Sequence, residues 1–284
     1  MADTLGNSTT YTSADIEVDL TAPTPAPSLS FNAFTNTYWS SGSIVYYRGA
    51  AASGSFAATA TATDPKSGIF SYAFPALGTN WTSTPGASGV NTYSWSGAEA
   101  IPGTKSVTAT NNATGTSAAT SFTPTADDTA PSAGTVTYLN GTTTGTTVSV
   151  SFTTGTDAGS GLGTRLLQRA SATLTGSTCG SFGSFADRGS ADPTSPYVDT
   201  VSAGNCYMYQ YVVLDNVGNT NTTTSASVAQ VTLDYFNTVS GTGGLLSYWR
   251  LGSATPGSDT FPNDLAGDAL HGAATGEIRA PWNH

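Results

Sequence analysis

Internal repetition is the feature that most constrains what this chain can fold into. The sequence Asp-Leu-Thr-Ala-Pro at 19–23 recurs as Asp-Asp-Thr-Ala-Pro at 127–131, a shift of 108 positions. The pattern Thr-Asp-x-x-Ser-Gly at 63–68 recurs at 156–161, a shift of 93 positions. Repetition at a nearly constant interval is typical of tandem structural units. The two shifts differ by a loop-sized insertion, so the chain is predicted to hold two copies of one unit.

A third element extends the repetition toward the N-terminus. Asp-Asn-Val-Gly-Asn at 215–219 has looser partners at 111–115 and at 3–7, and the last of these precedes a strand-like run, Ile-Glu-Val-Asp. We therefore expect residues 1–19 to be the last strand of an upstream repeat. An orphan strand exposes unpaired backbone donors and acceptors. Its expected partners are neighbouring repeats or copies of the same protein.

Alternating apolar and polar residues predict short β-strands. The alternation is visible at 56–63, at 148–152 and at 207–213, and Gly, Pro, Asn and Asp separate these runs. No stretch shows a convincing helical period. Each strand has one apolar face to bury against a second sheet, so the predicted fold is all-β, with tandem antiparallel sandwiches.

Composition excludes several classes of partner. Charged residues make up 9% of the chain, against about 25% in an average soluble domain. The net charge of −10 repels nucleic acid and anionic lipid, because both need Lys and Arg to replace their counterions. No apolar run is long enough to predict a membrane span. The 13 Tyr, 11 Phe and 5 Trp favour packed strands over disorder.

The residues that catalysis needs are scarce. The two histidines, His271 and His284, lie in the C-terminal tail, away from any candidate nucleophile, and the chain has three Glu. Spacings of Cys and His that bind transition metals are absent from the sequence. We therefore expect no enzymatic activity and no catalytic residues.

Cys179 and Cys206 are the only cysteines and stand 27 positions apart. A bridge that closes a loop of this size stabilises a fold by roughly 3.5 kcal/mol in the chain-entropy model. The surface-type composition favours such a bridge in an oxidising compartment. The alternative is a reduced pair in a cytosolic protein. We expect the disulfide, and with it an extracellular or cell-surface location.

The segment 204–219, in which Tyr, Tyr, Tyr and Val alternate before Asp-Asn-Val-Gly-Asn, resembles the penultimate strand and turn of fibronectin type III and related bacterial Ig-like repeats. Those families run Tyr-x-Val-x-Ala-x-Asp-x-x-Gly-Asn. The resemblance implies Ig-like repeats at 20–128 and 129–235, and an upstream Ig-like repeat that ends at 1–19. It also implies that Tyr209 is buried and that its hydroxyl ties the strand to a neighbouring loop.

The tail resembles a different family. Residues 243–252, Gly-Gly-Leu-Leu-Ser-Tyr-Trp-Arg-Leu-Gly, are followed by Asp259, Asp264 and Gly267. This pattern is similar to the opening of a concanavalin A-like, laminin G-type jelly roll. The resemblance implies that residues 243–284 are the start of such a domain, incomplete in this sequence.

Calcium is the cation that the aspartates could bind. Asp19, Asp128 and Asp215 are expected at domain junctions or on the turn that faces them, and Ca²⁺ prefers carboxylate and carbonyl oxygens. The alternative is that these aspartates only cap turns. No other cofactor is expected.

Two further sets of residues have a binding interpretation beside a structural one. Asp64 and Asp157, with Ser67 and Ser160, could form ligand-contacting loops or simple turns between strands. Three tryptophans could stack on sugar rings, or be core or sandwich-edge residues; they are Trp39, Trp81 and Trp95.

Two functions follow from different classes. The first is a structural or spacer array in a large surface or fibre protein, which presents a recognition domain. The second is an adhesive module that binds a glycan or surface ligand. In a variant of the second, the array is an accessory region of a secreted glycan-active enzyme.

Overall fold

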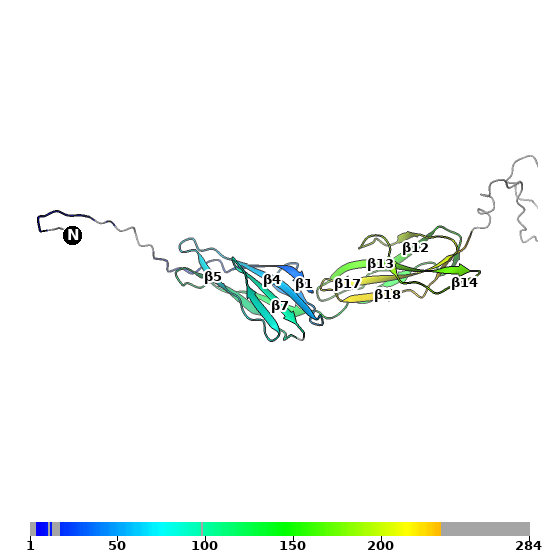
Figure 1. Ribbon diagram of the computed structural model, residues 1–284, viewed down its shortest axis with the longest axis horizontal. Helices are drawn as coiled ribbons and strands as arrows, with labels where there is room; N and C mark the ends of the chain where they lie inside the picture. The colour runs from blue at the N-terminus through cyan, green and yellow to red at the C-terminus, as the bar shows by residue number, and fades with distance from the viewer. Residues whose placement is uncertain (1–3, 11, 13–17, 98, 234–284) are drawn as a thin grey trace, which may run out of the picture.

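The computed structural model describes residues 4–10, 12, 18–97 and 99–233, and every regular element in these ranges is a β-strand. The strands form two sandwiches that lie end to end (Figure 1), one within 28–126 and the other within 135–231. The all-β prediction is therefore confirmed. The described part contains no helix that is long and apolar enough to cross a membrane.

The first sandwich consists of a four-stranded and a five-stranded sheet. The four-stranded sheet has the order β1 (Ser28–Thr35), β4 (Ser53–Thr61), β7 (Val90–Ser96) and β6 (Trp81–Pro85). The five-stranded sheet has the order β2 (Thr37–Tyr38), β3 (Ile44–Tyr47), β9 (Thr120–Ala126), β8 (Lys105–Asn111) and β5 (Ile69–Ala73).

This strand order is that of an immunoglobulin-like domain. When β1, β4, β5, β6, β7, β8 and β9 are taken as strands A to G, the two sheets read A-B-E-D and G-F-C. These are the sheets of the constant-type immunoglobulin sandwich. Strand β3 adds to the edge of the second sheet, parallel to β9. The predicted Ig-like sandwich is therefore present in the first repeat, although that repeat lacks the family's tyrosine.

The second sandwich has a three-stranded sheet, β10 (Thr135–Thr137), β12 (Thr147–Thr153) and β16 (Tyr197–Thr200). The opposite sheet has the order β11 (Gly141–Thr143), β19 (Ala229–Val231), β17 (Asn205–Asp215), β13 (Leu162–Thr175) and β14 (Thr178–Cys179). Strand β15 (Ala186–Asp187) also pairs with β13, and β18 (Thr220–Thr224) pairs with β17.

Alternation along the strands decides which side chains enter each core. In β12, Val148, Val150 and Phe152 are buried, whereas Ser149 and Ser151 are exposed. In β17, the tyrosines at 207–211 alternate inward in the same way and pack with the β12 residues. The core of the first sandwich gathers Phe31, Val45, Phe56, Tyr93, Val107 and Phe122. Burial of such side chains is the main favourable term in folding.

The structure corrects which tyrosine ties strand β17 to the loop before it. The hydroxyl of Tyr207 donates to the carbonyl oxygen of Ser202 at 3.1 Å and accepts from the Ser202 backbone nitrogen at 2.9 Å. This bond to the backbone five residues upstream has the geometry of the tyrosine corner of Ig-like domains. Tyr209 is buried as expected, but its hydroxyl donates to Asp199 in β16. Tyr209 lies two residues further along the strand, so the loop is out of its reach.

The expected disulfide is confirmed. Cys179 in β14 is bonded to Cys206 in β17, with 5.9 Å between the two Cα atoms. Cys206 is fully buried. The bridge therefore fastens the short hairpin formed by β13 and β14 to the central strand of the sheet.

Two predictions fall on other parts of the chain. The upstream strand was expected within residues 1–19, of which 4–10, 12, 18 and 19 are described, and these hold no strand. The expected jelly-roll opening at 243–284 lies outside the described residues. The upstream strand and the jelly roll stay predictions.

Candidate functional site at the junction of the sandwiches

Direct contacts join the two sandwiches. Arg48, which follows β3, donates from Nη1 to the carbonyl oxygen of Gly218 at 3.0 Å. The backbone of Asp127 forms hydrogen bonds with both sandwiches. Its N–H donates to the carbonyl of Tyr47 at 2.8 Å, and its carbonyl accepts from Asn219 Nδ2 at 2.8 Å. Asp127 is therefore held by both sandwiches.

Three carboxylates converge at this junction. Asp127 follows β9, Asp157 lies in the loop between β12 and β13, and Asp215 ends β17. One oxygen from each carboxylate lies within 4.8 Å of the others, and Asp127 and Asp215 are buried. Oxygens so arranged are the ligands that a hard divalent cation prefers.

Each carboxylate also orders the backbone next to it. Asp127 Oδ2 accepts from the N–H of Ser160 at 2.6 Å, and Asp157 Oδ2 accepts from the N–H of Gly161 at 2.7 Å. Asp215 Oδ1 accepts from three N–H groups of the turn at 217–219. Asp215 therefore caps the turn that follows it, as its alternative interpretation expected, and Asn219 Nδ2 of that turn donates to its second oxygen.

The first sandwich carries a counterpart of this cluster at its N-terminal end. Asp19, Asp64 and Ser67 take the places of Asp127, Asp157 and Ser160, as the repeated sequences predict. Asp19 Oδ2 accepts from the Ser67 hydroxyl at 2.6 Å. This hydrogen bond is the main cause that holds the pKa of Asp19 well below its usual range.

An amide completes the counterpart where the second sandwich has a third carboxylate. Asn111 occupies the position of Asp215, and its Nδ2 donates to Asp64 Oδ2 at 2.9 Å and to Asp19 Oδ2 at 3.2 Å. It also donates to the carbonyl of Thr21 at 2.8 Å. The first cluster is thus satisfied by a side-chain donor.

The three aspartates predicted to bind calcium lie in three different places. Asp19 belongs to the cluster of the first sandwich, and Asp215 belongs to the junction cluster. Asp128 Oδ1 instead accepts from the N–H of Ala50 at 2.6 Å. The junction cluster uses Asp127, which the sequence prediction missed. The shift of 108 positions that relates Thr21 to Thr129 also relates Asp19 to Asp127, so the signal was available.

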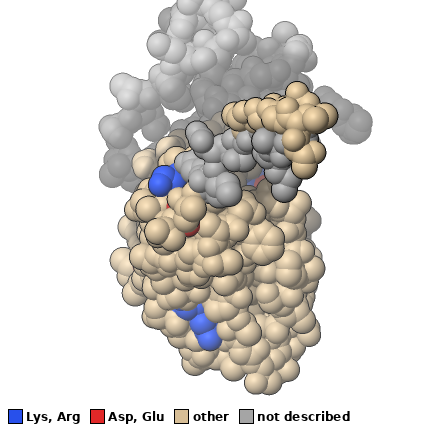
Figure 2. Space-filling view, turned by 90° about the vertical axis from the view of Figure 1, so that its left-hand side faces the viewer, with Lys and Arg blue, Asp and Glu red and all other residues tan. Residues whose placement is uncertain are grey.

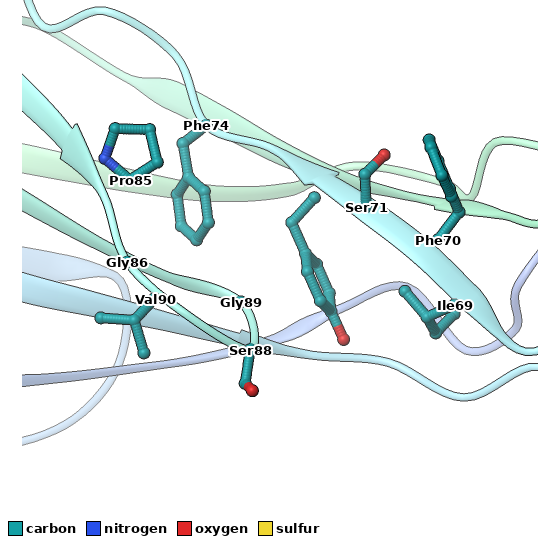
Figure 3. Close-up of a pocket in the computed structure, with 10 residues that line it drawn as sticks. Ile69, Phe70, Ser71, Phe74, Pro85, Gly86, Ser88, Gly89 and Val90 are labelled. Atoms are coloured by element: carbon teal, nitrogen blue, oxygen red, sulfur yellow. The ribbon is translucent and has the colours of Figure 1, made fainter.

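A groove in the first sandwich is a second candidate site (Figure 3). It has a volume of about 450 Å³ and lies between β5 and the turn that joins β6 to β7. Phe74, Pro85 and Val90 gather at one end of it, and Ile69 and Phe70 lie at the other. Phe70 is 72% exposed. The groove therefore presents an aromatic side chain to solvent.

Of the three tryptophans considered for sugar stacking, Trp95 is buried, and Trp39 and Trp81 are half-buried and pack against the core of the first sandwich. Trp95 is 2% exposed, and its ring lies 4.9 Å from the ring of Trp81. Trp39 packs edge-on against Phe31 and donates from Nε1 to the carbonyl of Gly42. The core interpretation is therefore correct for these residues.

A buried ionic network in the second sandwich was not predicted. The Asp199 carboxylate, 1% exposed, accepts from Arg169, Arg188 and the Tyr209 hydroxyl at 2.8 to 3.2 Å. Burial and the bond to Asp199 raise the pKa of Tyr209 far above its ordinary value. Arg169, Arg188 and Tyr209 all donate to Asp199, so the network serves the fold.

No family model matches this sequence, and no curated protein matches it. One solved structure that resembles this chain is chimeric titin Z1Z2 functionalized with a KLER exogenous peptide from decorin. The sequence identity is 13% and the TM-score is 0.32, and the match covers 73% of this chain and 96% of that chain. The tandem Ig repeats of Dlar match at 14% identity and a TM-score of 0.24, over 73% and 98% of the two chains.

The adhesin InvE of Yersinia pseudotuberculosis matches at 16% identity and a TM-score of 0.19, over 73% of this chain and 58% of that one. At these scores, the Ig-like fold of the present chain rests on its own strand order.

Proposed function

We propose that this chain is a non-catalytic structural spacer, a pair of Ig-like repeats in a larger extracellular or surface protein. The observation that carries the proposal is the end-to-end arrangement of the two sandwiches (Figure 1). The linker between them is short, since β9 ends at Ala126 and β10 begins at Thr135. Contacts across the junction, above all Arg48 with Gly218, restrict bending.

The scarcity of charged side chains on the visible surface supports a spacer role, because recognition of a charged partner needs charged side chains. Figure 2 views the first sandwich from its N-terminal end, where the visible described surface is almost entirely uncharged, with isolated Lys or Arg side chains. The tryptophans of the first sandwich are used in its core. Aromatic side chains that stabilise a core are not available to stack on a ligand.

The disulfide supports an extracellular location. Bridges such as Cys179–Cys206 form and persist in oxidising environments and are rare in the cytosol. A spacer exposed to dilution and proteases gains from a cross-link that restrains the unfolded chain.

A distance measurement on the full chain tests the spacer proposal. Ala119 and Thr144 are exposed and lie at the outer ends of the first and second sandwich. Cysteines introduced at these two positions accept a donor and an acceptor dye. Single-molecule energy transfer is expected to give one narrow distribution at a long distance. A broad or short distribution would contradict a spacer. Turnover on a panel of glycans and peptides would contradict the absence of catalysis.

Adhesion to a glycan or surface ligand is the second candidate, and the groove beside Phe70 favours it. An exposed phenyl ring next to a concave surface can stack on the apolar face of a sugar. A glycan array probed with the full chain tests this function. Binding should be lost in Phe70→Ala and kept in Phe34→Ala, which removes another exposed Phe from the same sandwich. Equal binding by both variants would exclude the groove.

A further inference from the structure

The junction cluster brings three carboxylates together, and none of them forms an ion pair with a described residue. Asp127, Asp157 and Asp215 have carboxylate oxygens within 4.8 Å of one another. The ion pairs among the described residues involve other aspartates, Asp192 and Asp199. Like charges this close repel strongly in a partly buried site unless a cation offsets them.

A buried hydroxyl without a partner lies beside these carboxylates. Ser160 is 5% exposed, and its Oγ has no hydrogen-bond partner among the described residues. The backbone nitrogen of the same residue lies 2.6 Å from Asp127 Oδ2, which places residue 160 beside that carboxylate. Buried polar atoms are nearly always paired. The Ser160 hydroxyl is therefore a fourth oxygen that needs a ligand at the cluster.

The counterpart in the first sandwich shows what kind of group is needed. There, Asn111 Nδ2 donates to two carboxylates and a carbonyl, and the Ser67 hydroxyl donates to Asp19. In the second sandwich, the residue at the Asn111 position is Asp215, an acceptor in place of a donor. Asn219 Nδ2 donates to Asp215 Oδ2, but no described side chain donates to the carboxylate of Asp127 or Asp157, so a positive group from outside the chain would complete the cluster.

We propose that Asp127, Asp157, Asp215 and the Ser160 hydroxyl bind one calcium-type divalent cation. No described residue donates to Asp127 Oδ1 or Asp157 Oδ1, so both oxygens are free to coordinate. Among the described residues, Asn219 is the one donor to Asp215 Oδ2. Calcium accepts six to eight oxygens in flexible geometry, so water completes the shell.

The cation would fasten the two sandwiches together. Asp127 is held in the first sandwich by its N–H bond to Tyr47, whereas Asp157 and Asp215 belong to the second. A bound cation therefore adds a cross-link at the same junction as the Arg48 bond. This mechanical consequence rests on the proposed spacer function, but the cation binding itself does not.

Calorimetric titration of chelator-treated full chain with CaCl₂ tests the site. We expect binding in the range of about 10⁻⁴ to 10⁻³ M, as in extracellular calcium modules. Asp157→Asn removes one charged ligand and should weaken binding by at least about tenfold. Asp187→Asn makes the same change of charge at an exposed position of the second sandwich and should leave binding unchanged.

Asp215→Asn provides a second test, because it reproduces the arrangement at Asn111. The amide can accept from the turn and donate to the other two carboxylates, so the variant should fold and yet lose calcium binding. Ser160→Ala should weaken calcium binding severalfold. Failure of CaCl₂ to bind the wild type overturns the proposal. So does unchanged affinity in Asp157→Asn or Ser160→Ala, or equal affinity for MgCl₂.

The dye-labelled chain separates this inference from the spacer proposal. Calcium should narrow the distance distribution of the wild type and leave that of Asp157→Asn unchanged. Calcium binding without any narrowing would support the site and refute its mechanical role. A narrow, long distribution that calcium does not alter, with no heat of binding, would support the spacer and overturn the site.

Discussion

Arg48 of the first sandwich donates from Nη1 to the carbonyl oxygen of Gly218 in the second, across a distance of 3.0 Å. A hydrogen bond from a charged donor contributes roughly 1.5 to 3 kcal/mol when it is shielded from water. Arg48→Ala should therefore loosen the junction without unfolding either sandwich. Energy transfer between dyes at 119 and 144 should report a broader distribution. Lys66→Ala, in the exposed loop beside Asp64 at the N-terminal end of the first sandwich, is the control and should leave the distribution unchanged.

The buried Asp199 predicts a large loss of stability on substitution. Asp199→Ala leaves Arg169, whose side chain is 18% exposed, without its carboxylate, and also frees the Tyr209 hydroxyl. Breaking one side of a buried pair costs about 3 kcal/mol or more. Urea unfolding of the second sandwich should show this loss.

Asp192 provides a matched comparison for Asp199. It also pairs with an arginine, Arg165, but the two side chains are 48% and 37% exposed. Exposed pairs contribute about 1 kcal/mol or less. Asn tolerates the positive φ of residue 192, 56°, so Asp192→Asn should lower the free energy of unfolding by no more than that. If the Asp192 and Asp199 variants lost the same free energy of unfolding, the buried network around Asp199 would not be more stabilising than the exposed pair.

The disulfide predicts a stability difference confined to one sandwich. Replacing both Cys179 and Cys206 by Ser should lower the free energy of unfolding of the second sandwich by about 3.5 kcal/mol. The first sandwich contains neither cysteine, so its unfolding transition should not move. Non-reducing peptide mapping of exported protein should find the linked pair. Two alkylatable thiols in the native exported protein would contradict the disulfide.

Alkaline pH should destabilise the second sandwich through Tyr209. Burial and Asp199 raise the pKa of Tyr209 in the folded state, whereas the unfolded chain has the ordinary value of about 10. The folded state therefore holds this proton more tightly. The resulting stabilisation is complete below pH 10 and is lost as the pH rises above it.

Tyr209→Phe checks this dependence. Above pH 10 the free energy of unfolding of the variant should fall less steeply, by about 1.4 kcal/mol per pH unit, because one titrating group is gone. Denaturant unfolding at several alkaline pH values measures the slope. Identical slopes in variant and wild type would show that Tyr209 ionises normally in the fold.

Much of the fold was predictable because it depends on local pattern. Alternation along 148–152 correctly predicted that Val148, Val150 and Phe152 face the core, since successive side chains of a strand point to opposite faces. The cysteine pair was predictable because two cysteines allow one bridge. Repeated turns were predictable because Gly68 and Gly161 both adopt positive φ, at 72° and 83°, which favours glycine in each repeat.

The site residues were less predictable, because two residues of the same type that lie close together in the sequence make different contacts in the fold. Nothing in the local pattern distinguishes Asp127 from Asp128, yet one faces Asp215 and the other binds the N–H of Ala50. Tyr207 and Tyr209 point to the same face, and only the position of the preceding loop decides which hydroxyl reaches it.

By itself, then, the sequence determined the class of the fold, the two repeats and the inward face of the main strands. Those properties follow from residue periodicity and turn chemistry, which act over a few positions. The tertiary structure alone decided that Asp127, Asp157 and Asp215 meet, and that Arg48 reaches Gly218. These residues are far apart in the chain, and their meeting depends on how strands pair and how two sandwiches stack.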